Sequence, residues 1–177
     1  MTITNDIREQ VRRRANFACE FCGVTETDVG GELTIDHFRP ITKDGDDGLE
    51  NLLYCCHRCN QYKLDYWSTH PDEPSLWNPR REPVAQHFLE LDNGMLHPLT
   101  DTGAFTLKRL RLNRPPLVAY RLRKRQQAEE IRLLTRYREM VQLLEQLNTQ
   151  LSVLMQEQRQ LLEEQRELLR LLLSTRK

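Results

Sequence analysis

Apolar positions recur with a helical period over the last third of the chain. From about Leu117 onward they lie three or four residues apart, and neither glycine nor proline interrupts the pattern. With Leu134 at position a of a heptad, positions a, d and g are apolar in most repeats. This stripe is wider than a two-stranded seam requires. We therefore predict an amphipathic helix on the order of 80 Å long, which forms a coiled coil or docks on a partner.

The heptad pattern also bears on the partner. Asn148 falls at position a, where a polar side chain costs stability but favours two strands in one register. We expect a homodimer through this helix. Docking of the helix onto a different protein is the competing interpretation, and the sequence leaves it open.

Shorter elements are predicted before the long helix. Asn5 is a candidate N-cap for a first helix that ends at the first cysteine pair. A turn around residues 92–94 joins two strands of a hairpin, and residues 70–84 are rich in proline and irregular. The remaining predicted elements are strands at 33–37 and 52–55, separated by a Gly- and Asp-rich loop, and a helix around 60–67.

These elements predict an α+β fold in three parts. Residues 1–68 form a small core that contains the two strands, residues 69–116 form an accessory hairpin and basic segment packed on it, and residues 117–177 form the long helix. The proline pair at 115–116 marks the last boundary.

Composition narrows the possible settings. The chain has 26 basic and 26 acidic residues among 177, so its net charge does not indicate a polyanionic partner. The N-terminus lacks the apolar core of a signal peptide, and no stretch approaches the ~20 apolar residues of a membrane span. We expect a cytoplasmic protein without membrane contact, in which thiols stay reduced.

Two C-x-x-C units stand out: Cys19 with Cys22, and Cys56 with Cys59. Each unit can present both sulfurs to one tetrahedral ion, so the four cysteines predict a zinc site. Four thiolates close the coordination shell, which makes such a zinc structural. Buried inert cysteines and a redox-active pair are the weaker alternatives. The fifth cysteine, Cys55, is expected to be a buried thiol.

Between and after the cysteine pairs stand IDHFRPI, with Asp36 and His37, and LENLLYCCHRCN, with Asn51 and Asn60. In this order and spacing, together with CEFCG and QYK, the sequence resembles the four-cysteine subgroup of the HNH endonuclease family. The resemblance implies a ββα-metal fold. It also implies that His37 is the general base, that Asp36 and Asn60 bind a catalytic ion, and that Asn51 orients the loop that aims His37.

The residue types suit phosphodiester hydrolysis independently of the resemblance. The reaction needs an activated water and positive charge near the phosphate. An imidazole serves the first need, and a carboxylate with an amide oxygen serves the second by binding Mg²⁺ or Mn²⁺. Many family members have histidine where this chain has Asn60, which shifts the expected metal toward such oxygen-preferring ions. Neighbours on a strand point to opposite sides, so Asp36 and His37 can cooperate only where the strand ends or bulges.

Basic residues cluster after the hairpin, in a run of eighteen residues without an acidic side chain. Such a run is a solvated face or a contact for a phosphate backbone, and beside a nuclease site we favour the second. Three further basic residues flank the predicted site. The complete set of expected nucleic-acid contacts is Arg39, Arg58, Lys63, Lys108, Arg109, Arg111, Arg114, Arg121, Arg123, Lys124 and Arg125.

The sequence therefore predicts a metal-dependent HNH endonuclease with one structural zinc ion, acting on DNA in preference to RNA. Residues 87–125 also resemble the region after the HNH core in bacterial family members found in anti-phage gene sets, which implies a role in antiviral defence. The alternatives are a non-catalytic zinc-knuckle module that binds nucleic acid and assembles through its helix, and a nuclease subunit that stays silent until a partner protein activates it.

Overall fold

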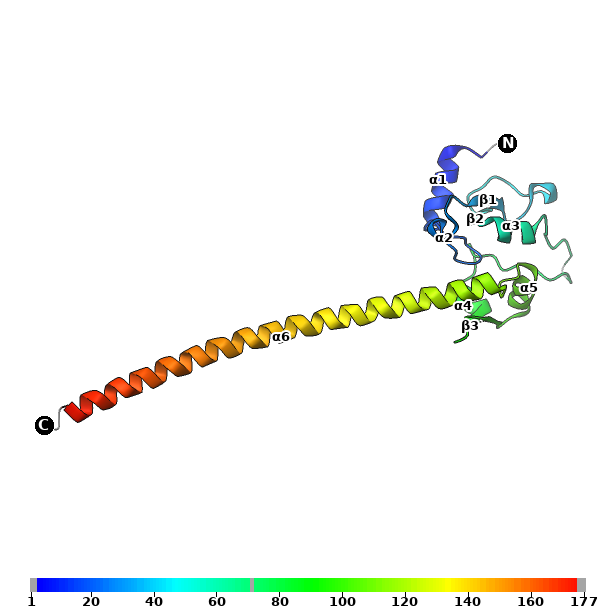
Figure 1. The fold of residues 1–177 in the computed structure, drawn as a ribbon. Coiled ribbons are helices and arrows are strands. Elements are labelled where there is room, and N and C mark those ends of the chain that lie inside the picture. Colours follow the sequence, from blue (N-terminus) through cyan, green and yellow to red (C-terminus); the bar gives the residue numbers. More distant parts are fainter. Residues whose placement is uncertain (1–2, 71, 175–177) are drawn as a thin grey trace. The chain divides into compact units, whose positions relative to one another are not determined.

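The computed structural model describes residues 3–70 and 72–174. The chain divides into two compact units, residues 1–124 and 125–177. The first contains all the short elements, and the second contains most of one long helix (Figure 1). The α+β class is thus confirmed. The elements before the long helix are α1 (Asn5–Arg14), α2 (Glu26–Val29), β1 (Thr34–His37), η1 (Ile41–Lys43), β2 (Leu52–Cys55), α3 (His57–Lys63), α4 (Val84–His87), β3 (Phe88–Glu90), β4 (Leu96–Pro98) and α5 (Asp101–Arg109).

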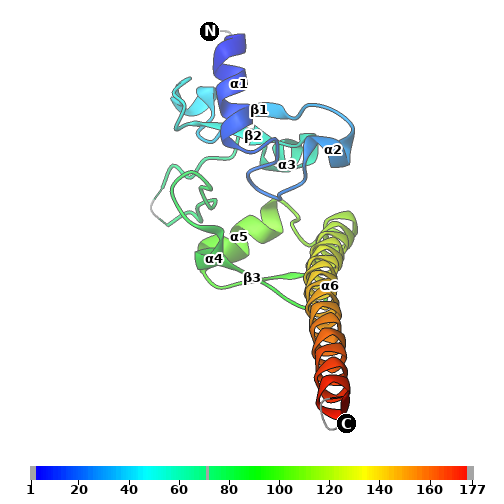
Figure 2. The ribbon, with the colours of Figure 1, turned by 90° about the vertical axis from the view of Figure 1, so that its left-hand side faces the viewer.

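Strands β1 and β2 form an antiparallel pair in which Thr34 faces Cys55 and His37 faces Leu52. Helix α1 packs against β2 and helix α3 against β1, and Figure 2 shows these four elements gathered together. All of β2 is buried, so it lies at the centre of the small core. The predicted strands are confirmed, with β1 starting one residue later than expected.

The limits of two helices differ from the prediction. Thr4, not Asn5, caps α1, because its hydroxyl accepts the Ile7 N–H at 3.4 Å. Helix α1 stops at Arg14, since Asn16 and Phe17 have positive φ angles that turn the chain before the first cysteine. Helix α3 begins at His57 and ends at Lys63, earlier at both ends than the expected 60–67.

A second layer follows the core in sequence. Strands β3 and β4 pair as the predicted hairpin, with Gly94 at φ +76 in the turn. Helix α5 was not predicted: Thr100 caps it by accepting the Gly103 N–H at 3.0 Å. Its buried residue Thr106 accepts the backbone N–H of Trp77, which ties the irregular segment before α4 to this helix.

Helix α6 runs from Pro115 to Ser174 without interruption, which confirms the predicted long helix (Figure 1). Its first turns belong to the first unit, where Leu117 and Tyr120 are buried. Beyond residue 124, the described apolar side chains are exposed except that of Val141, which is partly buried, as expected for a helix seen without a partner. The coiled coil stays a prediction. Among the described helices, none combines the length and apolarity that a membrane crossing needs.

Candidate functional site

Four cysteine sulfurs converge at the base of the strand pair. The Sγ atoms of Cys19, Cys22, Cys56 and Cys59 all lie within 4.8 Å of one another, and those of Cys22 and Cys56 are 3.7 Å apart. Sulfurs that bind one tetrahedral zinc ion at about 2.3 Å are about 3.8 Å from each other. The cluster therefore fits a structural zinc ion whose coordination is completed by protein.

Local backbone structure presents these sulfurs. In the Cys19–Cys22 pair, a turn brings the Gly23 N–H to the Cys19 carbonyl at 2.8 Å, with Gly23 at φ +73. In the Cys56–Cys59 pair, the Cys56 sulfur caps α3 by accepting the Cys59 N–H at 3.5 Å. This cap explains why α3 starts at His57, because the helix begins directly after the sulfur that satisfies its first donors.

Two further residues complete the knuckle. Cys55 is fully buried with its sulfur 3.6 Å from the Cys56 carbonyl, in agreement with the expected buried thiol. Arg114 donates from Nη2 to the Cys59 sulfur at 3.7 Å, and its guanidinium lies over the Tyr62 ring. Arg114 was expected to contact phosphate, but it lies at the knuckle instead. There its positive charge offsets the negative charge of the thiolates.

Asp36, the residue before the last in β1, faces α3. Its Oδ2 atom lies 3.2 Å from the ammonium of Lys63, which is fully buried and also donates to the His37 carbonyl at 2.6 Å. Burial raises the pKa of Asp36, and the Lys63 charge opposes this shift. Because Lys63 has no exposed surface, our expectation that it binds phosphate is wrong; it holds the end of β1 instead.

The same carboxylate offers a place for a cation. Asp36 Oδ2 is buried and receives no well-directed hydrogen bond from the described residues. One turn before Lys63, Asn60 donates from Nδ2 to the Thr34 hydroxyl at 3.4 Å. The Oδ1 atom of Asn60 has no hydrogen-bond partner among the described residues. Thr34 and Asp36 share one face of β1, so the Asn60 and Asp36 oxygens lie on the same side of the strand. This donor set fits an oxygen-preferring divalent ion.

His37 is the last residue of β1 and points to the other side, toward the loop. Its Nε2 lies 2.8 Å from Asp47 Oδ1, while its Nδ1 is neither hydrogen-bonded nor buried among the described residues. The strand ends here, as expected, and without a bulge in its register. Sequence reasoning missed Asp47, whose only signal was its place in the loop between the two strands.

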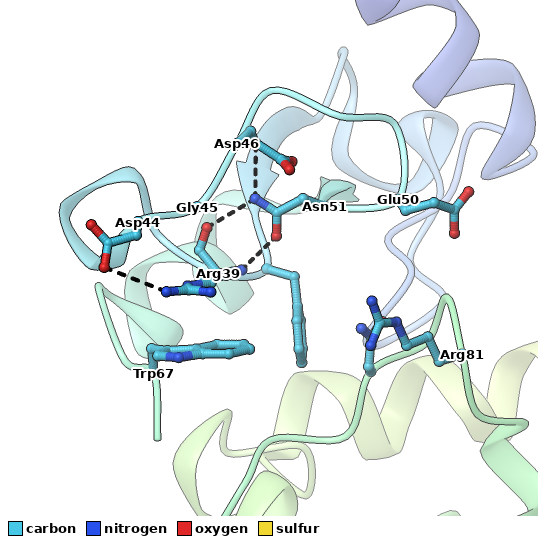
Figure 3. A pocket seen from close by; sticks show the side chains of 10 residues that line it. Arg39, Asp44, Gly45, Asp46, Glu50, Asn51, Trp67 and Arg81 are labelled. Atoms are coloured by element: carbon cyan, nitrogen blue, oxygen red, sulfur yellow. Dashed lines mark hydrogen bonds and ion pairs between the residues drawn. The ribbon is translucent and has the colours of Figure 1, made fainter. Parts of the chain in front are cut away.

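Asn51 ties the two limbs of that loop together. Its Oδ1 accepts the Arg39 N–H at 2.8 Å, and its Nδ2 donates to the carbonyls of Arg39 at 3.0 Å and Asp46 at 2.8 Å (Figure 3). At Gly45 the limbs approach so closely that a Cβ atom would stand 1.9 Å from the Arg39 carbonyl oxygen. The loop can adopt this shape only because residue 45 has no side chain.

A pocket of about 330 Å³ opens beside the loop. Its lining includes Asn51 but not Asp36, His37 or Asn60. The Arg39 guanidinium lies over the Trp67 ring, 5.4 Å from its centroid, and Arg81 stands apart from this pair (Figure 3). Acidic and basic side chains both line the pocket, so it presents no single sign of charge.

The remaining basic residues fall into three groups by burial. Arg121 is buried and donates to the carbonyls of Gly94 and Leu112, which contradicts its expected role at phosphates. Arg109 and Arg39 are partly buried, and each lies over an aromatic ring. The exposed members of the expected set are Arg58, Lys108, Arg111, Arg123, Lys124 and Arg125.

Comparison with known families agrees with the motif at this site. Residues 19–65, which contain both cysteine pairs and the Asp36 to Asn60 constellation, match the family model for HNH endonuclease. No curated protein and no solved structure matches the chain. The resemblance drawn from the sequence is thus confirmed for this segment, while the roles of its individual residues stay predictions.

Proposed function

We propose that the HNH domain at residues 19–65 makes this chain a metal-dependent endonuclease that hydrolyses phosphodiester bonds in DNA. The observation that carries the proposal is the pair of side chains at the end of β1. Asp36 offers a buried oxygen that pairs with the Lys63 ammonium at 3.2 Å but receives no well-directed hydrogen bond from the described residues, and His37 offers an accessible ring nitrogen without a hydrogen bond there. The Asp36 carboxylate can bind a cation, and the His37 ring can accept a proton from water. Phosphodiester hydrolysis needs both functions.

His37 is the proposed general base. A neutral imidazole with a hydrogen on Nε2 has its lone pair on Nδ1, the nitrogen that is open to solvent. It would take a proton from the attacking water, which makes that water a stronger nucleophile. Asn51 supports this step because its three hydrogen bonds fix the loop that faces the ring.

Asp36 and Asn60 are the proposed ligands of the working ion, Mg²⁺ or Mn²⁺. When bound, such an ion stabilises negative charge on the scissile phosphate and on the leaving oxygen. The products would carry 5′-phosphate and 3′-hydroxyl ends. Lys63, held 3.2 Å from Asp36, keeps that carboxylate in place from the protein side.

The exposed basic residues are the proposed backbone contacts. Arg58 lies in the first turn of α3, Lys108 near the end of α5, and Arg123 and Lys124 on an early turn of α6. Phosphate contacts release counterions, so binding should weaken steeply as salt rises. DNA binding measured at two salt concentrations tests this assignment, and affinity that does not depend on salt would contradict it.

The long helix is the proposed assembly element, and a second copy of the chain is its proposed partner. Leu147, Leu154 and Leu161 occupy position g in successive heptads and are 60%, 56% and 57% exposed in the single chain. Replacing Leu147 and Leu154 with Lys should convert a dimer into a monomer, as read by light scattering of the full chain. A wild-type monomer would contradict the proposal. The proposed setting, anti-phage defence, rests on the resemblance of residues 87–125 alone.

Cleavage of supercoiled plasmid tests the proposed activity. Nicked or linear product is expected in Mg²⁺ and Mn²⁺, and none in a chelator. The competing function is a zinc-knuckle module that only binds nucleic acid, which the Arg-rich exposed surface also allows. Salt-sensitive DNA binding without cleavage in any divalent ion would favour that alternative. Cleavage that appears only after a neighbour-encoded protein is added would identify a regulated subunit.

A further inference from the structure

The imidazole of His37 is held by one of its two nitrogens. Nε2 lies 2.8 Å from Asp47 Oδ1, and both side chains are partly exposed, at 21% and 29%. An ionised carboxylate has no hydrogen to donate, so the hydrogen in this contact belongs to Nε2. The contact therefore selects the tautomer whose lone pair is on Nδ1, and it also fixes the plane of the ring.

The backbone on both sides of Asp47 is fixed as well. Before it, the Asp46 carbonyl accepts from Asn51 Nδ2 at 2.8 Å (Figure 3). After it, the Gly48 N–H donates to Asp46 Oδ1 at 3.0 Å, which closes a tight turn around Asp47. Asp47 is thus set on a braced piece of loop, although its own carboxylate lies partly in solvent.

We infer that Asp47 is the positioning residue of the site: it orients the His37 ring and holds the tautomer that can accept a proton. This inference rests on the proposed nuclease function and deepens it. It gives Asn51 a defined route to the base, from its amide through the Asp46 carbonyl to the Asp47 carboxylate and on to Nε2. Among the described residues, the hydrogen-bond partner of the Asp47 carboxylate is His37.

The other carboxylates of the loop supply the contrast. The Asp46 carboxylate accepts the Gly48 N–H. The Asp44 side chain is 96% exposed, and its Oδ2 lies 3.5 Å from Arg39 Nη2. Asp44 also has a left-handed backbone, at φ 59, which asparagine tolerates. Asp44→Asn therefore removes one negative charge from the same loop without touching His37, and it serves as the matched control.

The test combines kinetics with a direct reading of the ring. Asp47→Ala should lower kcat for plasmid cleavage by about 10- to 100-fold with little change in KM, as for other partners that orient a functional imidazole. Asp47→Glu should restore part of the loss, and Asp44→Asn should leave kcat unchanged. In ¹⁵N-resolved NMR spectra, wild-type His37 should show the Nε2–H tautomer, and Asp47→Ala should show a mixture. The chain has five histidines, so a His37→Ala spectrum assigns the signals.

The outcomes separate this inference from the nuclease proposal. If Asp47→Ala keeps both the wild-type tautomer and the wild-type kcat, the positioning role is refuted while the nuclease proposal stands. If the wild type does not cleave DNA, the nuclease proposal falls, and the NMR comparison still decides whether Asp47 orients the ring. An equal loss of kcat in Asp44→Asn would also refute the inference, since loop charge alone would then explain the effect.

Discussion

Replacing Gly45 with alanine should damage the loop that faces His37. The added Cβ would stand 1.9 Å from the Arg39 carbonyl oxygen and 2.8 Å from that of Pro40, both on the opposite limb. Ordinary contacts of this kind lie at about 3.4 Å, so the Arg39 carbonyl must move by about 1.5 Å. Both atoms are backbone, which means that the shift cannot be absorbed by rotation of a side chain.

That shift breaks specific hydrogen bonds. The Arg39 carbonyl accepts from Asn51 at 3.0 Å, and the Gly45 N–H donates to the Pro40 carbonyl at 3.0 Å. At about 0.5–1.5 kcal/mol each, their loss should lower the free energy of unfolding by about 1–3 kcal/mol. Because the loop also positions the proposed base, kcat should fall by about 100-fold.

Urea denaturation and plasmid cleavage measure the two effects. Gly31→Ala is the matched control, because a Cβ at Gly31 meets nothing within 4 Å and its φ is ordinary. If Gly45→Ala and Gly31→Ala have the same unfolding midpoint and the same kcat, the close approach of the two limbs affects neither stability nor activity, which would contradict this prediction.

Three further predictions concern the knuckle, the buried ion pair and acid stability. Lys63→Met should cost about 3 kcal/mol in urea denaturation, because it leaves a buried carboxylate unpaired; a change below about 1 kcal/mol would contradict the pairing. Mass spectrometry should find one zinc ion per chain, retained in Cys55→Ala but lost in Cys22→Ser; equal zinc content in both would refute the ligand set. The Arg12 hydrogen bond lowers the pKa of Glu26 to about 2, so this carboxylate stabilises the fold above about pH 4.5 and loses its contribution as the pH falls toward 2. The stability difference between wild type and Glu26→Gln should therefore shrink over that range, and a constant difference would show that the contact does not matter.

The parts of the fold that follow from local spacing could be predicted from the sequence. Two C-x-x-C units specify a four-sulfur cluster wherever the chain brings them together, and the apolar periods at 33–37, 52–55 and beyond 117 specify strands and helix. The start of α3 could not be predicted in the same way. Its first donor is satisfied by the Cys56 sulfur, and standard capping rules do not cover a metal-ligating thiol.

The errors at the site share one physical cause. Lys63, Arg114 and Arg121 were expected at phosphates because Lys63 flanks the predicted site and the two arginines belong to the basic run that follows the hairpin. Each instead contacts a group that is distant in sequence or lies in a buried turn. Arg114, for example, contacts the sulfur of Cys59, which precedes it by 55 residues. Partners of this kind depend on the tertiary fold. Asp47 was missed for the complementary reason: the loop contains three aspartates, and nothing in their order says which one reaches His37.

The proposed nuclease activity depends on His37 as its base. It is tested most directly by comparing wild type with His37→Ala on supercoiled plasmid in Mg²⁺, with zinc content measured on both proteins. The wild type should nick or linearise the plasmid, and His37→Ala should lose this activity by about 100-fold or more while keeping its zinc. Equal cleavage by the two proteins would contradict it.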